Sequence, residues 1–406
     1  MSPRRRPKAQ AGLTLVELLV AMAIGLIVTL AVTSVVLVGE NHKRATTAIN
    51  DANQSGSYAA YLLDRALRSA GSGFTQAWDL GVFGCRLNVY RGGGAVLPRA
   101  SAFPAPFAGV PQTLNMAPVL IQRGDDSDVL VVMGGNAAAG DIPRPILSAG
   151  ADENSLRLNN TIGLQAGDIG LVSREGVDDC LIEQVSAAGA SGGGGSESEG
   201  EEEGATPPND LLTLGGTYLA TTGKEASLST LVDGGNAFFS PVGRAGANNV
   251  QFQMFGVDGE RRLLNYDLMH FAGSDSAAVQ ALADGVVTLR AVYALDANGD
   301  GRFNTADGDR WAAPDEEGYD IQSLMDTPAT ARQVLAVRVA LVLRSTHFEK
   351  PAAEDEYVSP ASLTLFGDLP EAQRSTYTIA TEDRQFRHRV VDLTVPLRNM
   401  LLLPTS

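Results

Sequence analysis

The sequence has few of the residues that build metal centres and nucleophilic active sites. Among 406 residues there are only two cysteines, Cys85 and Cys180, and no C-x-x-C pair, so neither a zinc site nor a thioredoxin-like redox site is indicated. The four histidines show no ligand spacing such as H-E-x-x-H, and no Ser/His/Asp order stands out; they are His42, His270, His347 and His388. We therefore expect a protein that works through its surfaces and is not an enzyme.

Positive charge is scarce as well. The chain has 31 lysines and arginines against 47 aspartates and glutamates, which gives a formal net charge of -16. Four of the cations lie in the first eight residues, so a chain without that leader carries -16 - 4 = -20. Such an acidic body argues against binding of nucleic acid or anionic lipid. It is compatible with binding of cations.

One long hydrophobic run stands out, from Leu13 to Val38, and Glu17 is its only charged residue. As a helix the run is about 39 Å long, enough to cross the ~30 Å hydrocarbon layer of a bilayer. Because basic residues precede it, we expect a single membrane pass with a cytoplasmic N-terminus and the body on the outer side. By itself this pattern also fits a plain signal anchor.

Glu17 argues against a plain signal anchor. An unpaired carboxylate in a bilayer costs roughly 2.5 kcal/mol or more, so it normally has a partner or a function. A basic leader, Gly12 and an apolar helix with one early acid resemble the N-terminus of type IV prepilins and type II secretion pseudopilins. The resemblance implies that prepilin peptidase removes residues 1–12 and that Leu13 becomes the methylated N-terminal residue. Glu17 would then meet the ammonium of a neighbouring subunit during assembly. The resemblance also implies that the membrane is the inner membrane and that the body is periplasmic. Most relatives have Phe where this chain has Leu13, and Ser34 lies near the place of a proline found in many major pilins.

The helix is predicted to continue past the membrane. Apolar residues recur at three- and four-residue steps over residues 39–70, which indicates an amphipathic helix. Gly71 and Gly73 are typical of a helix end. We expect one spine helix over 13–70, with an assembly half at 13–38 and a second half at 39–70 that packs on the globular body.

The remaining chain is predicted to be mostly antiparallel sheet, so the fold class is α+β. Short runs rich in β-branched residues and bounded by turn residues predict strands at 128–133, 168–172, 180–185, 237–239, 250–255, 285–295, 333–344 and 389–398. We expect an irregular connection at 74–125, a helix at 276–282 and a disordered Gly/Ser/Glu loop at 186–210. That loop divides the body into residues 71–185 and 211–406. It either interrupts one sheet or separates two lobes.

The expected export of the body bears on the state of the two cysteines. An exported body lies in an oxidising compartment, which favours a disulfide between Cys85 and Cys180. The alternative is a pair of buried thiols.

A candidate metal loop lies at residues 296–307. Oxygen-bearing side chains occupy its first, third, fifth, ninth and twelfth places, a glycine occupies the sixth, and the seventh offers a main-chain carbonyl; the proposed ligands are Asp296, Asn298, Asp300, Arg302, Asn304 and Asp307. This spacing predicts a structural Ca²⁺ site. The loop follows a predicted strand, whereas an EF-hand loop lies between two helices, so this is not an EF-hand. Asp in place of Glu at the twelfth position makes the loop resemble the dockerin type. The alternative is a solvated turn, which favours the same residue types.

Several blocks of the second half resemble PilW-type minor pilins. They are residues 285–295 with the acidic loop that follows, residues 334–345, and the closing segments 386–389 and 394–399, together with Arg65 and Arg68 at the end of the helix. Ala294 departs from the Gly that many relatives carry there. Residues 74–125 and 186–210 find no counterpart in the resemblance.

The resemblance implies a structural minor pilin that primes assembly at the tip of a type IV pilus, with adhesion or motility as a consequence. Its expected partners are prepilin peptidase, other minor and major pilins through the N-terminal helix, and a tip adhesin. One alternative is the larger minor pseudopilin of a type II secretion system, which shares the helix and the closing strand. A membrane-anchored adhesin or enzyme is the other.

Overall fold

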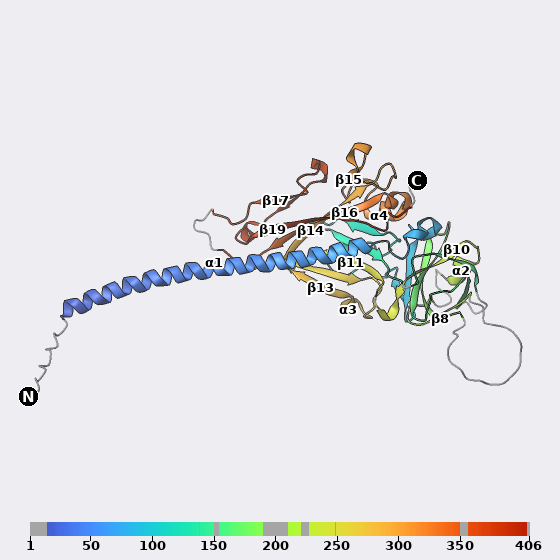
Figure 1. Ribbon diagram of the computed structural model, residues 1–406, viewed down its shortest axis with the longest axis horizontal. Coiled ribbons are helices and arrows are strands. Elements are labelled where there is room, and N and C mark those ends of the chain that lie inside the picture. Colours follow the sequence, from blue (N-terminus) through green and yellow to red (C-terminus); the bar gives the residue numbers. More distant parts are fainter. Residues whose placement is uncertain are drawn as a thin grey trace, which may run out of the picture.

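The computed structural model describes residues 14–137, 139–149, 154–189, 210–220, 227–247, 249–349 and 356–403. A long helix, α1 (Leu15–Ser69), projects from one end of a body built of strands and short helices (Figure 1). Its first half stands clear of the body, and its second half lies along it. This arrangement confirms the α+β class and the spine helix, whose described part begins at Leu15 and ends at Ser69.

Local sequence explains the limits of α1. Thr14 is the N-cap, since its hydroxyl oxygen accepts the main-chain N–H of Glu17 at 3.3 Å. The next 55 residues contain no proline. After the C-cap Ala70, Gly71 has φ of 79°, a left-handed conformation that glycine adopts without strain. The N–H of Gly71 then donates to the carbonyl of Met133 at 2.8 Å, which ties the end of the helix to the body.

Two antiparallel sheets flank the second half of α1 (Figure 1). The first has the order β13-β12-β11-β4-β3, with β3 (Val119–Gln122), β4 (Val129–Gly134), β11 (Gln251–Val257), β12 (Arg262–Asp267) and β13 (Val279–Asp284). The second has the order β15-β14-β16-β19, with β14 (Val286–Leu295), β15 (Arg310–Ala312), β16 (Val334–Arg344) and β19 (His388–Pro396). The helix contacts β4 and β13 of the first sheet and β16 and β19 of the second.

A third sheet closes on itself at the end of the body that lies farthest from the start of α1 (Figure 1). Its order is β2-β1-β8-β7-β10-β5-β6-β9, and β9 pairs back to β8, so that the six strands from β8 to β9 form a barrel. These strands are β5 (Arg144–Ala149), β6 (Ser155–Leu158), β7 (Asp168–Arg174), β8 (Asp179–Ala188), β9 (Leu211–Leu214) and β10 (Ala237–Arg244). Outside the ring, β1 (Arg86–Arg91) pairs in parallel with β8, and β2 (Gly94–Leu97) pairs with β1.

Short elements lie between the strands of these sheets. The helix α2 (Leu228–Val232) packs on β5, β7 and β8 of the barrel. Three more short helices are α3 (Asp275–Ala278), α4 (Ile321–Asp326) and α5 (Pro328–Arg332). Two single turns, η1 (Thr75–Ala77) and η2 (Trp78–Val82), follow α1, and a hairpin of β17 (Ser362–Leu365) and β18 (Ser375–Thr378) precedes β19.

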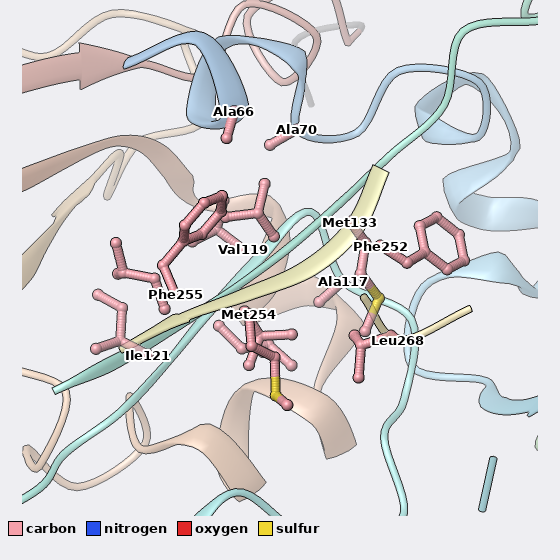
Figure 2. Packing of buried hydrophobic residues seen from close by; sticks show 14 of the residues in the cluster. Ala66, Ala70, Ala117, Val119, Ile121, Met133, Phe252, Met254, Phe255 and Leu268 are labelled. Atoms are coloured by element: carbon pink, nitrogen blue, oxygen red, sulfur yellow. The ribbon is translucent and has the colours of Figure 1, made fainter. Parts of the chain in front are cut away.

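Each sheet contributes to a buried core. The largest core joins α1 to both flanking sheets, and Figure 2 shows Ala66 and Ala70 facing the cluster around Phe252, Met254 and Phe255. Alanine at these helix positions lets α1 approach the sheet closely. A second core fills the barrel with residues such as Leu181 and Phe239, and a third lies between the β14–β16 pair and Phe366.

The predicted strands are confirmed as β4, β7, β8, β10, β11, β14, β16 and β19. The stretch at 186–210 interrupts one sheet, because β8 on one side and β9 and β10 on the other all belong to the barrel. Ser186, Ala187 and Ala188 lie in β8, so the predicted loop began three residues too early. Residues 190–209 lie outside the described part of the chain.

Two local predictions are wrong. Residues 74–125 are not an irregular connection, since they contain β1, β2 and β3 and bury Leu87, Val89 and Leu120. Strands this short gain their stability from partners far away in sequence, which local periodicity does not reveal. Residues 276–282 are not one helix: α3 ends at Ala278, and the chain then enters β13, where pairing with β12 prevails over helix propensity.

Candidate functional site

The exposed half of α1 is the first candidate site. From Leu15 to Val38 its large apolar side chains are exposed, for example Leu15 by 75%, Val35 by 72% and Leu26 by 65%. The helix is long and apolar enough to cross a membrane. An apolar surface of this size requires lipid or other helices to cover it.

Glu17 lies in the first turn of this helix, three residues after the capping Thr14. A carboxylate in the first turn interacts favourably with the helix dipole. Within the described residues Glu17 has no ion-pair partner and is exposed. Gly12 and Leu13, the predicted processing residues, lie outside the described part of the chain. The predicted roles of all three residues stay predictions.

The second half of α1 is fixed to the body by polar contacts as well as by the core. Ser55 Oγ donates to the carbonyl of Asp284 at 2.6 Å, and Ser69 Oγ donates to Gln251 Oε1 at 2.6 Å. Near the helix end, Asn399 Nδ2 donates to the carbonyl of Ala70 at 2.8 Å. Gly56 lies against β16, where a Cβ atom would come within 2.7 Å of Leu343 Cδ1. The helix therefore presents one half to the body and leaves the other half for different partners.

The acidic loop that follows β14 is the second candidate site. Asp296 is 4% exposed, and its carboxylate accepts the main-chain N–H groups of Gly299 and Gly301, both at 2.7 Å. Asn298 Oδ1 accepts the N–H of Asp300 at 3.0 Å. Asn304 Nδ2 donates to Asp307 Oδ2 at 2.6 Å, and both side chains are exposed. These contacts close the turn on itself.

Asp309 is a member of this loop that the sequence analysis missed. It is 3% exposed, and its two oxygens accept the N–H groups of Ala297 at 2.8 Å and Asn304 at 2.7 Å. It lies two places beyond the twelve-residue pattern, and only its alternation with Asp307 hinted at a role. In the described part of the chain, no three acidic, histidine or cysteine side chains converge as a metal ion requires. The side chain of Arg302 is exposed, and only its carbonyl was proposed as a ligand.

Cys85 and Cys180 form a disulfide. Cys85 immediately precedes β1, and Cys180 lies in β8, the strand with which β1 pairs in parallel. Both residues are buried, at 3% and 0% exposure. The bond spans 95 residues of sequence and links the segment after α1 to the barrel.

Glu183 is a carboxylate inside the barrel. It lies on β8 between Leu181 and Val185, which both belong to the barrel core, and a strand places alternate residues on one face. Its Oε1 accepts the N–H of Ala220 at 3.2 Å, and its Oε2 has no hydrogen-bond partner within the described residues. Burial raises the pKa of Glu183 to about 8, against the opposing effect of the Ala220 hydrogen bond.

A polar network around Tyr266 also escaped the sequence analysis, because its members are dispersed along the chain. Tyr266 Oη lies 2.6 Å from His270 Nε2, and Arg99 forms an ion pair with Asp275 at 2.8 Å. The hydrogen bond from Arg99 holds the pKa of Asp275 at about 2, well below its usual range. Tyr266 is completely buried, and its contacts with His270 and Asp275 anchor the loop after β12.

Comparison with known proteins places these features in a family. Residues 252–399 match the family described as type IV pilus-assembly protein W, PilW, and residues 7–37 match the prokaryotic N-terminal methylation motif. No curated protein and no solved structure matches the chain. The first match covers β12 to β19, part of β11 and the acidic loop, and the second covers the predicted processing site and most of the exposed apolar helix. Together the two matches support a PilW-type pilin-like protein, a minor pilin of a type IV pilus that is processed by prepilin peptidase.

Proposed function

We propose that the protein takes a place at or near the pilus tip, where it primes assembly through its N-terminal helix and presents its body to further tip components. The observation that carries this proposal is the division of α1 into two halves with different surroundings. One half packs against two sheets of the body, and the other exposes a predominantly apolar surface with a single charged residue, Glu17.

Assembly follows from this division. Packing of the exposed halves side by side removes apolar surface from lipid and water without altering the body. Glu17 is the only charged residue along the apolar half. The N-terminal ammonium of Leu13 in a neighbouring subunit can therefore pair with it in only one register of the two helices. Before assembly the N-terminus lies in the cytoplasm and the acidic body lies on the periplasmic side of the inner membrane. The basic leader favours this orientation, because positive charge stays on the cytoplasmic side.

The position in the pilus can be tested by immuno-electron microscopy with an antibody against the body. We expect label at pilus ends in the wild-type strain and none in a strain that lacks the protein. Label along the whole shaft would overturn the tip position. Pili without label, together with a loss of type II secretion in the deletion strain, would instead favour the pseudopilin alternative.

We also propose that the acidic loop binds Ca²⁺ as a structural ion. The support is the spacing of side-chain oxygens from Asp296 to Asp307, which are hard ligands of the kind calcium prefers. In the described arrangement the oxygens of Asp296 and Asn298 accept main-chain N–H groups and Asp307 accepts the Asn304 side-chain amide, so an ion has to replace some of these hydrogen bonds. A turn that is complete without an ion is the competing explanation, and the two differ in whether calcium raises the melting temperature.

A further inference from the structure

The segment that follows β16 runs back along α1 toward the apolar half of the helix. At the end of β16, Leu343 lies against Gly56. Beyond it, residues 346–347 line a pocket together with side chains from residues 40–51 of α1. Because the contacts move to lower helix numbers as the segment proceeds, it approaches Val38, the end of the apolar run.

This segment carries an exposed aromatic residue, Phe348, at 51% exposure. Its neighbour Glu349 has a pKa below its usual range, chiefly because Arg387 donates a hydrogen bond to it, and the charge of a protonated His42 acts in the same direction. His42 is four residues beyond Val38, about 6 Å along the helix axis. Since such an effect requires the two groups to be neighbours, Phe348 is held close to the end of the apolar run.

Contacts with the body hold Phe348 in this exposed position. Its ring meets the ring of Phe386 edge-on, with 5.6 Å between the two centroids. The guanidinium of Arg344 stacks on Phe386 in turn, with 4.1 Å between its Cζ atom and the ring centroid. The main-chain N–H of Glu349 donates to the carbonyl of Gln385 at 2.9 Å. The Phe348 ring is thus supported on one side and open on the other.

The membrane-spanning half of α1 determines what this end of the body faces. With Glu17 at one boundary of the hydrocarbon layer, the 21 residues from Leu18 to Val38 make about 31 Å of helix, which matches the ~30 Å thickness of that layer. Val38 then lies at the other boundary. The next 6 Å or so fall within the headgroup layer, which takes about 5–8 Å on each side. Phe348 is therefore level with the lipid headgroups.

Local charge permits this contact, although the whole chain carries a net charge of -16. Among the described residues that line the pocket beside α1 or form the neighbouring ion pair, acids and bases are equal in number; they are Glu40, Asp51 and Glu349 against Lys43, Arg44 and Arg387. Such an edge is neither strongly attracted nor strongly repelled by charged lipid. The aromatic ring is then the group that favours the membrane, because aromatic side chains partition into the interface between headgroups and acyl chains.

We propose that Phe348 docks the body on the phospholipid headgroup layer while α1 spans the membrane. The helix and the ring are then two points of attachment, and together they fix the tilt of the body relative to the membrane. The contact is lost when the helix leaves the bilayer. It requires only that α1 spans a membrane and does not depend on where the protein lies in a pilus.

The proposal can be tested by the fluorescence of the full-length chain in phosphatidylcholine vesicles that contain lipid with a nitroxide on its headgroup. The nitroxide quenches an indole only at close range. Phe348→Trp should lose most of the emission that it adds to that of the wild type, whose own tryptophans are Trp78 and Trp311. The matched control is Tyr61→Trp, at an exposed position of α1 about 35 Å beyond Val38, and its added emission should stay unquenched.

A reporter beside the native side chain tests whether Phe348 itself makes the contact. Thr346→Trp, at an exposed position two residues away, should be quenched while Phe348 is present. The same reporter should be quenched clearly less in the double variant Thr346→Trp/Phe348→Ser. Melting temperatures equal to that of the wild type show that the variants are folded.

The proposal is overturned if Phe348→Trp is quenched no more than Tyr61→Trp. It is also overturned if Thr346→Trp is quenched equally with and without Phe348, since the helix alone would then bring the body to the membrane. Quenching that requires anionic phosphatidylglycerol would overturn it as well, because charge and not the ring would then make the contact. None of these results bears on the position in the pilus, which immuno-electron microscopy tests separately.

Discussion

Asp309 reaches across twelve residues of chain to accept the main-chain N–H of Ala297 at 2.8 Å. Its other carboxylate oxygen accepts the N–H of Asn304, so one buried side chain holds the beginning and the middle of the acidic loop. Asp296 holds the intervening glycines in the same way. The two buried aspartates thus hold the main chain of the loop, whereas Asp300 and Asp307 are exposed and accept one hydrogen bond each from within the loop, from Arg302 N–H and from Asn304 Nδ2.

This difference yields a prediction about calcium. If the loop binds Ca²⁺, the melting temperature of the full-length protein in detergent rises on addition of calcium, because a ligand that binds only the folded state stabilises it. Asp300→Ala should abolish that rise and change the melting temperature in chelator little. Asp309→Ala should lower the melting temperature in calcium and in chelator alike, because it removes the acceptor of the Ala297 and Asn304 N–H groups that hold the loop closed.

Calcium titration with magnesium as the comparison ion completes this test. A wild-type melting temperature that is the same in calcium, magnesium and chelator would contradict the calcium proposal. It would leave the loop as a turn that its own aspartates complete, and the expected effect of Asp309→Ala would be unchanged.

Elements that follow from a local pattern could be predicted from the sequence, whereas those that depend on distant partners could not. The helix over 15–69 and strands such as β14 and β16 follow from periodicity, caps and runs of β-branched residues. The barrel could not be foreseen, because its closure depends on β9 pairing with both β6 and β8. Asp309 escaped for a similar reason: its role comes from hydrogen bonds to residues five and twelve places away, and no motif spacing includes it.

Glu17 gives the second prediction. Glu17→Ala should leave cleavage after Gly12 intact and strongly reduce the amount of this protein in sheared pili, because the only charge of the apolar half is lost. The matched control is Glu40→Ala, which removes a carboxylate from the same helix beyond the apolar half, where it pairs with Arg44. Immunoblots of pilus and membrane fractions measure both variants. Normal incorporation of the Glu17→Ala protein would refute the register argument.

Processing gives the third prediction. Gly12→Ala should accumulate a form that migrates more slowly on a gel, since the leader of twelve residues stays attached. The size of the mature wild-type protein by mass spectrometry provides the reference. A mature N-terminus at any residue other than Leu13 would show that the cleavage site is wrong.

The disulfide gives the fourth prediction. Replacing both Cys85 and Cys180 by serine should lower the stability of the body by about 2–5 kcal/mol, because the bond closes a long loop of the unfolded chain. Thermal melting in the absence of reductant measures the effect. Thiol labelling of the unfolded wild-type protein provides the control, and two reactive thiols without reductant would contradict the bond.

Glu183 gives the last prediction, which concerns pH. Its pKa is about 8 in the folded barrel and 4.5 in the reference state, so between these values the folded protein holds a proton that the unfolded chain has released. Stability contributed by this group is therefore complete below about pH 4.5 and decreases as the pH rises toward 8, by an amount of the order of a few kcal/mol. Glu183→Gln keeps the shape of the side chain and cannot ionise.

We therefore expect Glu183→Gln to melt at nearly the same temperature as the wild type at pH 5 and at a clearly higher temperature at pH 8. The control is Glu175→Gln, an exposed carboxylate at the end of β7, which should change neither value. If the wild type and Glu183→Gln lose the same stability between pH 5 and pH 8, the carboxylate is ionised in the folded barrel at both values.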